Sequence, residues 1–560
     1  MTAQSNWQAL AEAKRQAILK AIPEKWRLPT PVPPASKVRD VTGRYIQQYL
    51  SEREIEITES DAVEIASRTS TGRWSAVEVT EAFCHRAALA HQLVNCLHEM
   101  FFEAALEDAR KLDAYFAEHQ RPIGPLHGLP VSLKDQFHIK GVETTMGYVG
   151  WIGNFQGLKG DPRHLNHESE LVRELRALGA VLYCKTSVPA TLMSPETVNN
   201  IIEYTWNPKN RFLSCGGSSG GEGALLALRG SPVGFGTDIG GSVRIPSGFN
   251  YLYGLRPSSG RTPYEGAANS IDGQSTILSV IGPMAPTARS LVMIMKAVLS
   301  QQPWYHDPLV LDLPWRDDVV QQTRALIEQS KGGTPSLAFG ILRWDGIARV
   351  HPPIARGLKI IESTLKRLGH KVIPWSPPSH SKALELADKA YSMDGGADLA
   401  HHFGLSGEPQ PSQVIAGSNV PLSITELTAL NVAKREYQKE YMDYWNSTSE
   451  LTGTGRPVDG FFCPVAPYAA VVPHGYKHVG YTCFVNVLDY TSVTLPVTHA
   501  DKNVDVRSAT DEPADNVDWD YDAEVYDGAP VGIQLIGRRL QEEKILTLAE
   551  YLGDELGKTA

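Results

Sequence analysis

Cysteine is scarce in this sequence, and long apolar runs are absent. The six cysteines (positions 84, 96, 184, 215, 463 and 483) show no C-x-x-C spacing, which argues against zinc motifs and a disulfide framework and favours free thiols in a reducing cytosol. No uninterrupted apolar run approaches about 18 residues, so we expect no membrane span. The N-terminus lacks a basic stretch followed by an apolar one, and we therefore expect a cytoplasmic location.

Positive charge is in the minority. The chain has 53 lysines and arginines against 63 aspartates and glutamates, which gives a net charge of −10. No cluster of basic residues stands out, so nucleic-acid binding is not expected. The hydrophobic fraction of 42% and the charged fraction of 21% are ordinary for a globular protein. Composition therefore excludes several kinds of partner without identifying a function.

Helix-like and strand-like patterns alternate along the chain. Three units combine a helix, whose apolar residues recur at helical spacing, with one or two short apolar strands. These units span residues 168–184, 337–375 and 531–552. Such alternation predicts an α/β fold with a central mixed, mostly parallel sheet flanked by helices. A capping box formed by Ser75 and Glu78 predicts the start of a further helix.

The chain divides into an N-terminal extension and one large domain. Residues 5–22 predict an amphipathic helix, and four prolines between residues 29 and 34 predict an extended segment after it. Residues 1–36 are thus expected to pack on the body or to be tethered to it. No break in composition divides residues 60–555, which we interpret as one domain. Within it, residues 501–527 contain ten acidic residues and predict a solvated surface excursion.

Two segments rich in glycine and serine carry most of the chemical information. Ser218 lies within residues 215–223 (CGGSSGGEG), and Ser242 lies within residues 236–244 (GTDIGGSVR). Repeated glycine lets backbone N–H groups turn toward one point. A hydroxyl beside such donors provides the nucleophile and the oxyanion site that acyl transfer needs. Both segments run directly into apolar elements, which argues against flexible linkers.

Motifs for phosphate and metal binding are incomplete. Gly216 and Gly221 match the first six positions of a P-loop, but Glu222 and Gly223 stand where that motif has lysine and serine or threonine. A carboxylate there would repel phosphate. The histidines of residues 164–168 (HLNHE) match neither HExxH nor HxxEH. We therefore expect no metal and no cofactor.

An α/β-hydrolase elbow is the other alternative for this segment. The pattern G-x-S-x-G fits with either Ser218 or Ser219 as the nucleophile. The match is weak in a segment so rich in these two residue types. A triad would also need a later histidine. The candidates His370, His474 and His499 lie in no recognisable catalytic motif.

What remains is an arrangement of two serines and a lysine. Lys134 lies in an apolar, strand-like segment, residues 128–135. Burial of an ammonium group is costly and lowers its pKa, which would suit a base. Alone, Lys134 would be interpreted as a lysine paired with Asp135. The catalytic interpretation gains weight because two serines framed by glycine need a base.

The motifs around these three residues resemble the amidase signature family. Residues 216–224 and 236–246 are similar to the central signature of that family almost residue for residue, and residues 125–135 resemble its lysine segment. The resemblance covers roughly residues 60–555 and is closest to fungal acetamidases and fatty acid amide hydrolases. It implies a single α/β domain, hydrolysis of small-molecule carboxylic amides, and a homodimer.

The resemblance also implies a role for each site residue. Ser242 would be the nucleophile, Ser218 the bridging serine after a cis peptide bond from Gly217, and Lys134 the base. The oxyanion hole would consist of the backbone amides of Ile239, Gly240, Gly241 and Ser242. Leu192 and Met193 would contact the substrate, Leu192 through its backbone carbonyl. Asp238 and Arg244 would form a pair that fixes the loop, supported by Thr237.

Substrate preference and reaction type stay open at this point. Residues 400–430 look too polar for a membrane-dipping cap, which favours small to medium aliphatic amides over lipid-delivered substrates. Lipophilic or fatty acid amides are the alternative. A subunit that passes ammonia to a partner, or a binding protein without activity, would share the fold.

Overall fold

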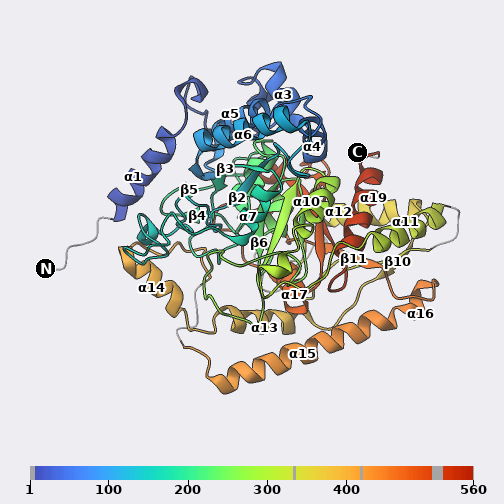
Figure 1. Ribbon diagram of the computed structural model, residues 1–560. Coiled ribbons are helices and arrows are strands. Elements are labelled where there is room, and N and C mark those ends of the chain that lie inside the picture. Colours follow the sequence, from blue (N-terminus) through green and yellow to red (C-terminus); the bar gives the residue numbers. More distant parts are fainter. Residues whose placement is uncertain (1–6, 332–335, 416–419, 508–520, 559–560) are drawn as a thin grey trace.

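The residues that the structure describes form a sheet of 11 strands through the middle of the molecule, with helices packed around it (Figure 1). The computed structural model describes residues 7–331, 336–415, 420–507 and 521–558. In spatial order the strands are β1 (Leu97–Met100), β3 (Val181–Thr186), β2 (Pro130–Lys134), β6 (Gly234–Asp238), β8 (Val280–Ala285), β7 (Tyr253–Arg256), β12 (Ser492–His499), β13 (Pro530–Ile536), β11 (Gly460–Pro464), β9 (Ala338–Ile341) and β10 (Lys371–Pro374). Strands β4 (Val198–Asn199) and β5 (Glu203–Tyr204) pair separately.

The sheet is mixed, as predicted, but it is less parallel than predicted. Among the described residues, four neighbouring pairs are parallel and six are antiparallel. The prediction rested on units in which a helix connects two strands, and such a crossover makes the strands parallel, as in β9 and β10. No helix lies within the described residues 257–279 between β7 and β8, and these two strands run antiparallel.

Helices cover both faces of the sheet. Those of the main body are α2 (Arg44–Gln47), α3 (Glu52–Glu59), α4 (Ala62–Thr69), α5 (Ala76–Val94), α6 (Phe102–His119), α7 (Glu170–Ala177), α8 (Gly220–Ala227), α9 (Arg244–Phe249), α10 (Ala288–Leu299), α11 (Asp317–Lys331), α12 (Pro352–Arg367) and α19 (Glu542–Gly557). At β13, Gly248 of α9 packs on Gly532, whereas Gly357 of α12 packs on Val531. Successive strand residues point to opposite faces, so α9 and α12 lie on opposite sides.

Predicted elements form close to their predicted positions. The first helix is α1 (Trp7–Lys20), and the three helix–strand units correspond to α7 with β3, to β9, α12 and β10, and to β13 with α19. The capping box is incomplete. The Ser75 hydroxyl accepts a hydrogen bond from the Glu78 amide at 3.0 Å, but the Glu78 carboxylate binds Arg53 at 2.8 Å instead of turning back to the Ser75 backbone.

Ion pairs with little exposure anchor α1 to the body. Lys14 pairs with Glu99 and, at 2.7 Å, with Glu143. Lys185 donates a hydrogen bond to the Glu143 carbonyl at 2.8 Å and pairs with the buried Asp135 at 2.7 Å. A continuous network therefore runs from the N-terminal helix into the segment that contains the predicted lysine.

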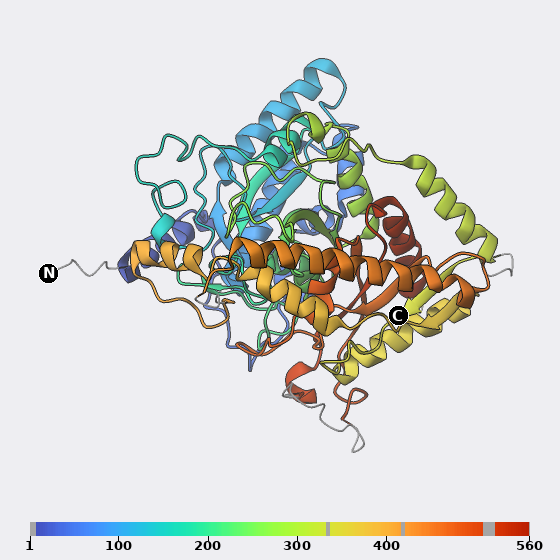
Figure 2. The same ribbon diagram turned by 90° about the horizontal axis from the view of Figure 1, so that it is seen from below.

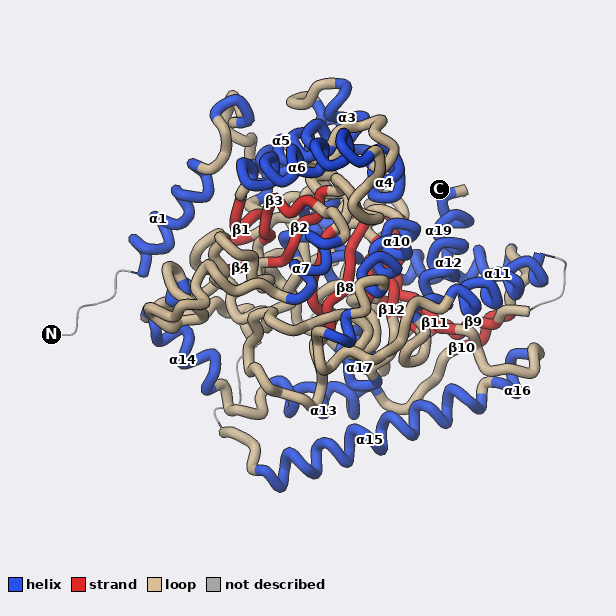
Figure 3. The backbone as a smooth tube through the Cα atoms, in the orientation of Figure 1, coloured by secondary structure: helices blue, strands red, loops and turns tan. Residues whose placement is uncertain are grey.

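A helical layer lies on the lower side of Figure 1. It contains α13 (His380–Tyr391), α15 (Ile424–Ser447), α16 (Ser449–Thr452) and α17 (Gly480–Leu488), with α14 (Ala397–Ser406) beside it. Figure 2, a view from below, shows α15 running across the molecule. In Figure 3 the helices are blue and the strands are red. None of the helices in the described ranges is both long and apolar enough to span a bilayer. Residues 416–419, within the stretch judged too polar for a membrane cap, lie outside the described residues.

The acidic excursion predicted at residues 501–527 is described only at its two ends. Residues 508–520 lie outside the described residues. In the first described part, the carboxylate of Asp505 is buried and pairs with Arg356 at 2.7 Å. In the second part, residues 523–526 form α18 (Ala523–Tyr526). The described ends are thus attached to the body.

Candidate active site

Lys134 and Thr237 lie at one edge of the sheet. Strands β2 and β6 are parallel neighbours, with Ser132 opposite Gly234. The carboxyl ends of parallel strands meet at the same edge, where open α/β sheets bind their ligands. Lys134 is the last residue of β2, and Thr237 lies next to the last residue of β6. The predicted lysine therefore lies where a site is expected.

Lys134 contacts two hydroxyl groups in the protein interior. Its Nζ lies 2.7 Å from Ser218 Oγ and 2.7 Å from Thr237 Oγ1. The side chain is fully buried. Burial lowers the pKa of Lys134 to about 7, although the charges of Asp238 and Glu222 act in the opposite direction. A substantial fraction of the amine is therefore uncharged near neutral pH.

Glu222 is fully buried and close enough to Lys134 for their charges to interact. Its carboxylate accepts hydrogen bonds from Ser132 Oγ at 2.7 Å and from Thr186 Oγ1 at 3.0 Å. Burial raises the pKa of Glu222 to about 8, against the effect of these hydroxyls and of Lys134. A carboxyl group that is mostly protonated at neutral pH does little to hold a proton on Lys134.

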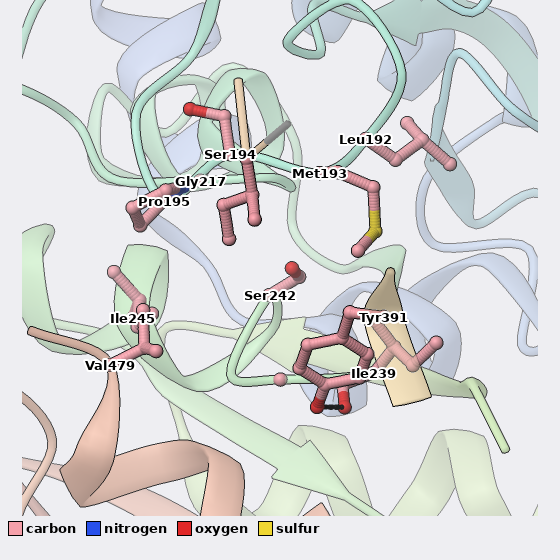
Figure 4. A pocket seen from close by; sticks show the side chains of 12 residues that line it. Leu192, Met193, Ser194, Pro195, Gly217, Ile239, Ser242, Ile245, Tyr391 and Val479 are labelled. Carbon is pink, nitrogen blue, oxygen red and sulfur yellow. Dashed lines mark hydrogen bonds between the residues drawn. The ribbon is translucent and has the colours of Figure 1, made fainter. Parts of the chain in front are cut away.

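The three serines differ in their surroundings. Ser218 is buried and follows a cis peptide bond from Gly217. Ser219 is also buried, and among the described residues its hydroxyl forms hydrogen bonds only with the backbone of Thr237, at 3.3 Å and 3.4 Å. Ser242 is partly exposed, and its hydroxyl points into a pocket (Figure 4). Of the three, Ser242 is the one placed to meet a ligand.

The two serine segments adjoin through their backbones. The Ser219 amide donates a hydrogen bond to the Ser242 carbonyl at 3.1 Å. Within the described chain, no hydrogen bond joins the hydroxyls of Ser218 and Ser242. The structure thus contains the contact between Lys134 and Ser218. The hydroxyls of Ser218 and Ser242 are not hydrogen-bonded to each other in the described chain.

Asp238 and Arg244 form a buried ion pair with two hydrogen bonds, at 2.9 Å and 3.0 Å. Burial acts to raise the pKa of Asp238, but Arg244 and the amide of Asn486 hold it far below its usual range. Asp238 also accepts hydrogen bonds from the backbone amides of Gly241 (2.9 Å) and Val243 (3.2 Å). Gly241 has a φ of +132°, a conformation that suits glycine. The pair therefore sets the shape of the loop before Ser242.

Two hydroxyls from distant helices hold carbonyl groups of the same loop. Tyr391 of α13 donates a hydrogen bond to the Ile239 carbonyl at 2.6 Å, and Thr482 of α17 donates one to the Gly240 carbonyl at 2.7 Å. The N–H and C=O of a trans peptide point in opposite directions. The bond from Tyr391 therefore fixes the direction of the Gly240 N–H.

The four amides predicted to form an oxyanion hole are not equivalent. The Gly241 amide donates to Asp238, so it is occupied in this structure. The amides of Ile239, Gly240 and Ser242 make no hydrogen bond to any described residue. Three of the four are therefore free to bind a ligand oxygen.

Ser242 opens onto a small apolar pocket (Figure 4). The pocket is lined by Leu192, Met193, Ser194, Pro195, Gly217, Ile239, Gly240, Ser242, Ile245, Tyr391, Ile415 and Val479. Its volume is about 40 Å³, enough for a few water molecules. The Met193 carbonyl accepts a hydrogen bond from the Ile415 amide at 2.8 Å, whereas no described residue donates one to the Leu192 carbonyl.

Sequence reasoning identified residues that the structure brings together, but it missed others. Lys134, Ser218 and Thr237 are in direct contact. The residues missed were Gln136, Tyr391, Thr482 and Asn486. Gln136 lies directly after the lysine segment of residues 125–135 and two residues after Lys134, so its spacing offered a signal. The other three come from segments without any motif.

Comparison with known proteins identifies the family of the chain. A family model described as Amidase matches residues 78–546. The chain is 47% identical to an acetamidase of Aspergillus oryzae, over 99% of both chains. It is 44% identical to an acetamidase of Emericella nidulans, over 99% of this chain and 98% of that one. Both relatives therefore match over nearly their whole length.

Solved structures show the same fold. A fatty acid amide hydrolase matches with a TM-score of 0.88 and 32% identity, over 99% of this chain and 95% of that one. A peptide amidase from Stenotrophomonas maltophilia, at 19% identity and a TM-score of 0.66, shares the fold over 89% of this chain and 97% of its own. The chain therefore belongs to the amidase family and is an amide-hydrolysing enzyme.

Proposed function

We propose that the enzyme cleaves carboxylic amides to an acid and ammonia or an amine through an acyl-enzyme on Ser242. In this proposal Lys134 is the base, and Ser218 carries the proton between Lys134 and Ser242. One observation carries the proposal: Lys134 Nζ lies 2.7 Å from Ser218 Oγ in a fully buried setting. A relay needs an uncharged amine beside a hydroxyl.

The first half of the reaction adds Ser242 to the amide carbon and gives a tetrahedral intermediate. Lys134 takes the proton of Ser218 while Ser218 takes that of Ser242, and Ser242 Oγ bonds to the amide carbon. The hydrogen bond between the two serines forms in the substrate complex, since catalytic hydrogen bonds tighten there. Amides of the 239–242 loop stabilise the oxyanion, and each such donor is typically worth about 3 kcal/mol.

The second half returns the protons. The C–N bond breaks as the proton on Lys134 passes back through Ser218 to the leaving nitrogen, which departs as ammonia or an amine. Water then attacks the ester carbon and gives a proton to the same relay. Ser242 regains its proton as the acid leaves. The carbonyl of Leu192, which has no other partner in the described chain, accepts a hydrogen bond from the substrate amide.

The size of the pocket favours small to medium aliphatic amides. A volume of about 40 Å³ suits a short acyl group, and the lining offers few polar partners beyond the reacting groups. Two relatives that match over nearly the whole chain are acetamidases. We therefore expect acetamide and its short homologues to be the better substrates.

Lipophilic amides are the second candidate. The similarity to a fatty acid amide hydrolase, with a TM-score of 0.88, and the apolar lining favour it. An acyl series from acetamide through hexanamide to oleamide separates the two candidates by the rate of ammonia release. Activity of the isolated chain on acetamide would also argue against an amidotransferase subunit. A homodimer and a cytoplasmic location stay predictions.

Mass spectrometry and kinetics test the mechanism together. A fluorophosphonate probe should label Ser242, as identified by peptide mapping. Ser242→Ala and Lys134→Ala should each abolish ammonia release from acetamide. Label on Ser219, or full activity of Lys134→Ala, would refute the assignment in favour of the elbow.

A further inference from the structure

The side chain of Gln136 is held in one orientation. Its Nε2 donates hydrogen bonds to the Ala268 carbonyl at 2.7 Å and to Tyr264 Oη at 3.0 Å. A carbonyl oxygen only accepts hydrogen bonds, so the amide nitrogen must face Ala268. The backbone carbonyl of Gln136 in turn accepts from the Ala268 amide at 2.9 Å. The carboxamide oxygen, Oε1, is therefore the atom presented on the other side.

This orientation decides which way Thr237 donates. Thr237 Oγ1 lies 2.7 Å from Gln136 Oε1. Because Oε1 has no proton, the single hydroxyl proton of Thr237 must lie in this contact. Thr237 can then meet Lys134, 2.7 Å away, only as an acceptor. Thr237 and Gln136 are both buried, so no bulk solvent competes for these contacts.

The series of hydrogen bonds from Gln136 through Thr237 ends at the amine of Lys134. An uncharged lysine amine has two protons and one lone pair. One proton is used by Thr237, which cannot donate back. The lone pair is thereby kept for the other hydroxyl in contact, Ser218. If Thr237 were free to turn, its proton would compete with that of Ser218 for the same lone pair.

We propose that Gln136 is a positioning residue that fixes the direction of the hydrogen bonds at Lys134, so that the lone pair of the amine faces Ser218. The inference rests on the proposed function of Lys134 as the base. Gln136 does not touch Ser218 or the pocket, and it acts through Thr237. Its role is to ensure that Lys134 accepts a proton from Ser218 and not from Thr237.

The pH profile of Gln136→Leu tests the proposal. Without Oε1, Thr237 donates to Lys134 in part of the molecules, which blocks proton transfer from Ser218. The kcat for acetamide should fall about tenfold, the scale of one hydrogen bond. A hydroxyl that donates to the amine favours its uncharged form. The acidic limb of kcat/KM should therefore move to lower pH by roughly half a unit to one unit.

A second substitution distinguishes this mechanism from a structural role. The double variant Gln136→Leu/Thr237→Val removes the hydroxyl that causes the harm, so it should turn over faster than Gln136→Leu alone. Gln92 is a matched control outside the site, since its Nε2 donates to the Trp26 carbonyl at 2.9 Å and its Oε1 accepts from the Leu28 amide at 2.8 Å. Gln92→Leu should lower the melting temperature without moving the acidic limb.

Two results would overturn the inference. One is an acidic limb of Gln136→Leu that coincides with that of the wild type. The other is a double variant slower than Gln136→Leu. Labelling of Ser242 and the loss of activity in Lys134→Ala are measured in parallel. If both hold while the limb stays in place, the relay stands and only the role of Gln136 is rejected.

Discussion

Tyr391 donates a hydrogen bond to the carbonyl of Ile239, 152 positions away in the sequence, at 2.6 Å. The ring of Tyr391 also lines the pocket beside Ser242. One residue of α13 thus shapes the substrate cavity and holds a peptide whose N–H is a proposed oxyanion donor. These two roles can be separated, because phenylalanine keeps the ring and lacks the hydroxyl.

Tyr391→Phe should lower kcat and leave KM nearly unchanged. Loss of the hydrogen bond lets the peptide between Ile239 and Gly240 rotate, which weakens stabilisation of the oxyanion but not ground-state binding. We expect about a tenfold fall in kcat for acetamide, measured by steady-state kinetics. Tyr444→Phe removes a hydroxyl that contacts the Ser376 amide at 2.6 Å, away from the pocket, and should change neither constant. A rise in KM at constant kcat would contradict this assignment.

The pKa of Lys134 should appear in both activity and stability. Because its pKa in the folded protein is about 7, kcat/KM should rise with pH along a limb centred near 7. Between pH 7 and the unfolded value of 10.5, the unfolded chain holds more protons than the folded one, so stability rises with pH.

Lys134→Met isolates this contribution. Relative to the variant, the wild type should gain about 2 kcal/mol of unfolding free energy between pH 7 and pH 9. Urea denaturation at the two pH values measures the difference. Unfolding free energies that change equally in both proteins would show that the amine is already protonated in the folded state at pH 7.

The neighbouring serines should differ sharply in their response to alanine. Within the described part of the chain, the Ser219 hydroxyl forms hydrogen bonds only with the backbone of Thr237. Ser219→Ala should therefore keep the rate within about tenfold, the scale of one hydrogen bond. Ser218→Ala interrupts the proposed relay and should lose about a thousandfold or more in kcat. Ammonia release from acetamide compares the two. An inactive Ser219→Ala beside an active Ser218→Ala would exchange their roles.

Arg244→Met should destabilise the fold strongly. It leaves the carboxylate of Asp238 buried without its cation, and such a loss typically costs about 3–5 kcal/mol. Lys439→Met is the control, since Lys439 and Asp443 form an ion pair whose side chains are 61% and 57% exposed. Exposed pairs are worth about 1 kcal/mol or less. Chemical denaturation compares the two, and equal losses would mean that the buried pair is not essential.

Met193→Ala should shift the acyl preference toward longer chains. Shortening this side chain enlarges a pocket of about 40 Å³, and one or two methylene groups of extra room change discrimination by about tenfold or more. The ratio of kcat/KM for hexanamide to that for acetamide should rise accordingly. Met442→Ala alters an exposed side chain of α15 and should leave the ratio unchanged.

The sequence was informative wherever the chemistry is local. Lys134 at the end of an apolar strand, and serines framed by glycine, could be identified because their neighbours in sequence are also their neighbours in space. The helix–strand units were found for the same reason. The number of parallel strands was overestimated, because antiparallel pairs such as β7 with β8 are joined without a helix and leave no helical pattern.

The rest of the site depends on contacts between distant segments. Tyr391 and Thr482 reach the loop from α13 and α17, and nothing in their own segments indicates a partner. The occupied amide of Gly241 follows from the position of the Asp238 carboxylate, a detail that no motif specifies. Gln136 could have been noticed by its spacing from Lys134, but its orientation depends on the Ala268 carbonyl.

The anchoring of α1 bears on how the chain tolerates proteolysis. Cleavage in the stretch that follows residue 20 would release Lys14 and leave the carboxylates of Glu99 and Glu143 without this cation. The backbone carbonyl of Glu143 accepts a hydrogen bond from Lys185. Lys185 in turn neutralises Asp135, the residue directly after the proposed base, Lys134. Removal of a segment that contributes no residue to the pocket lining would thus disturb a series of ion pairs and a hydrogen bond that ends beside Lys134.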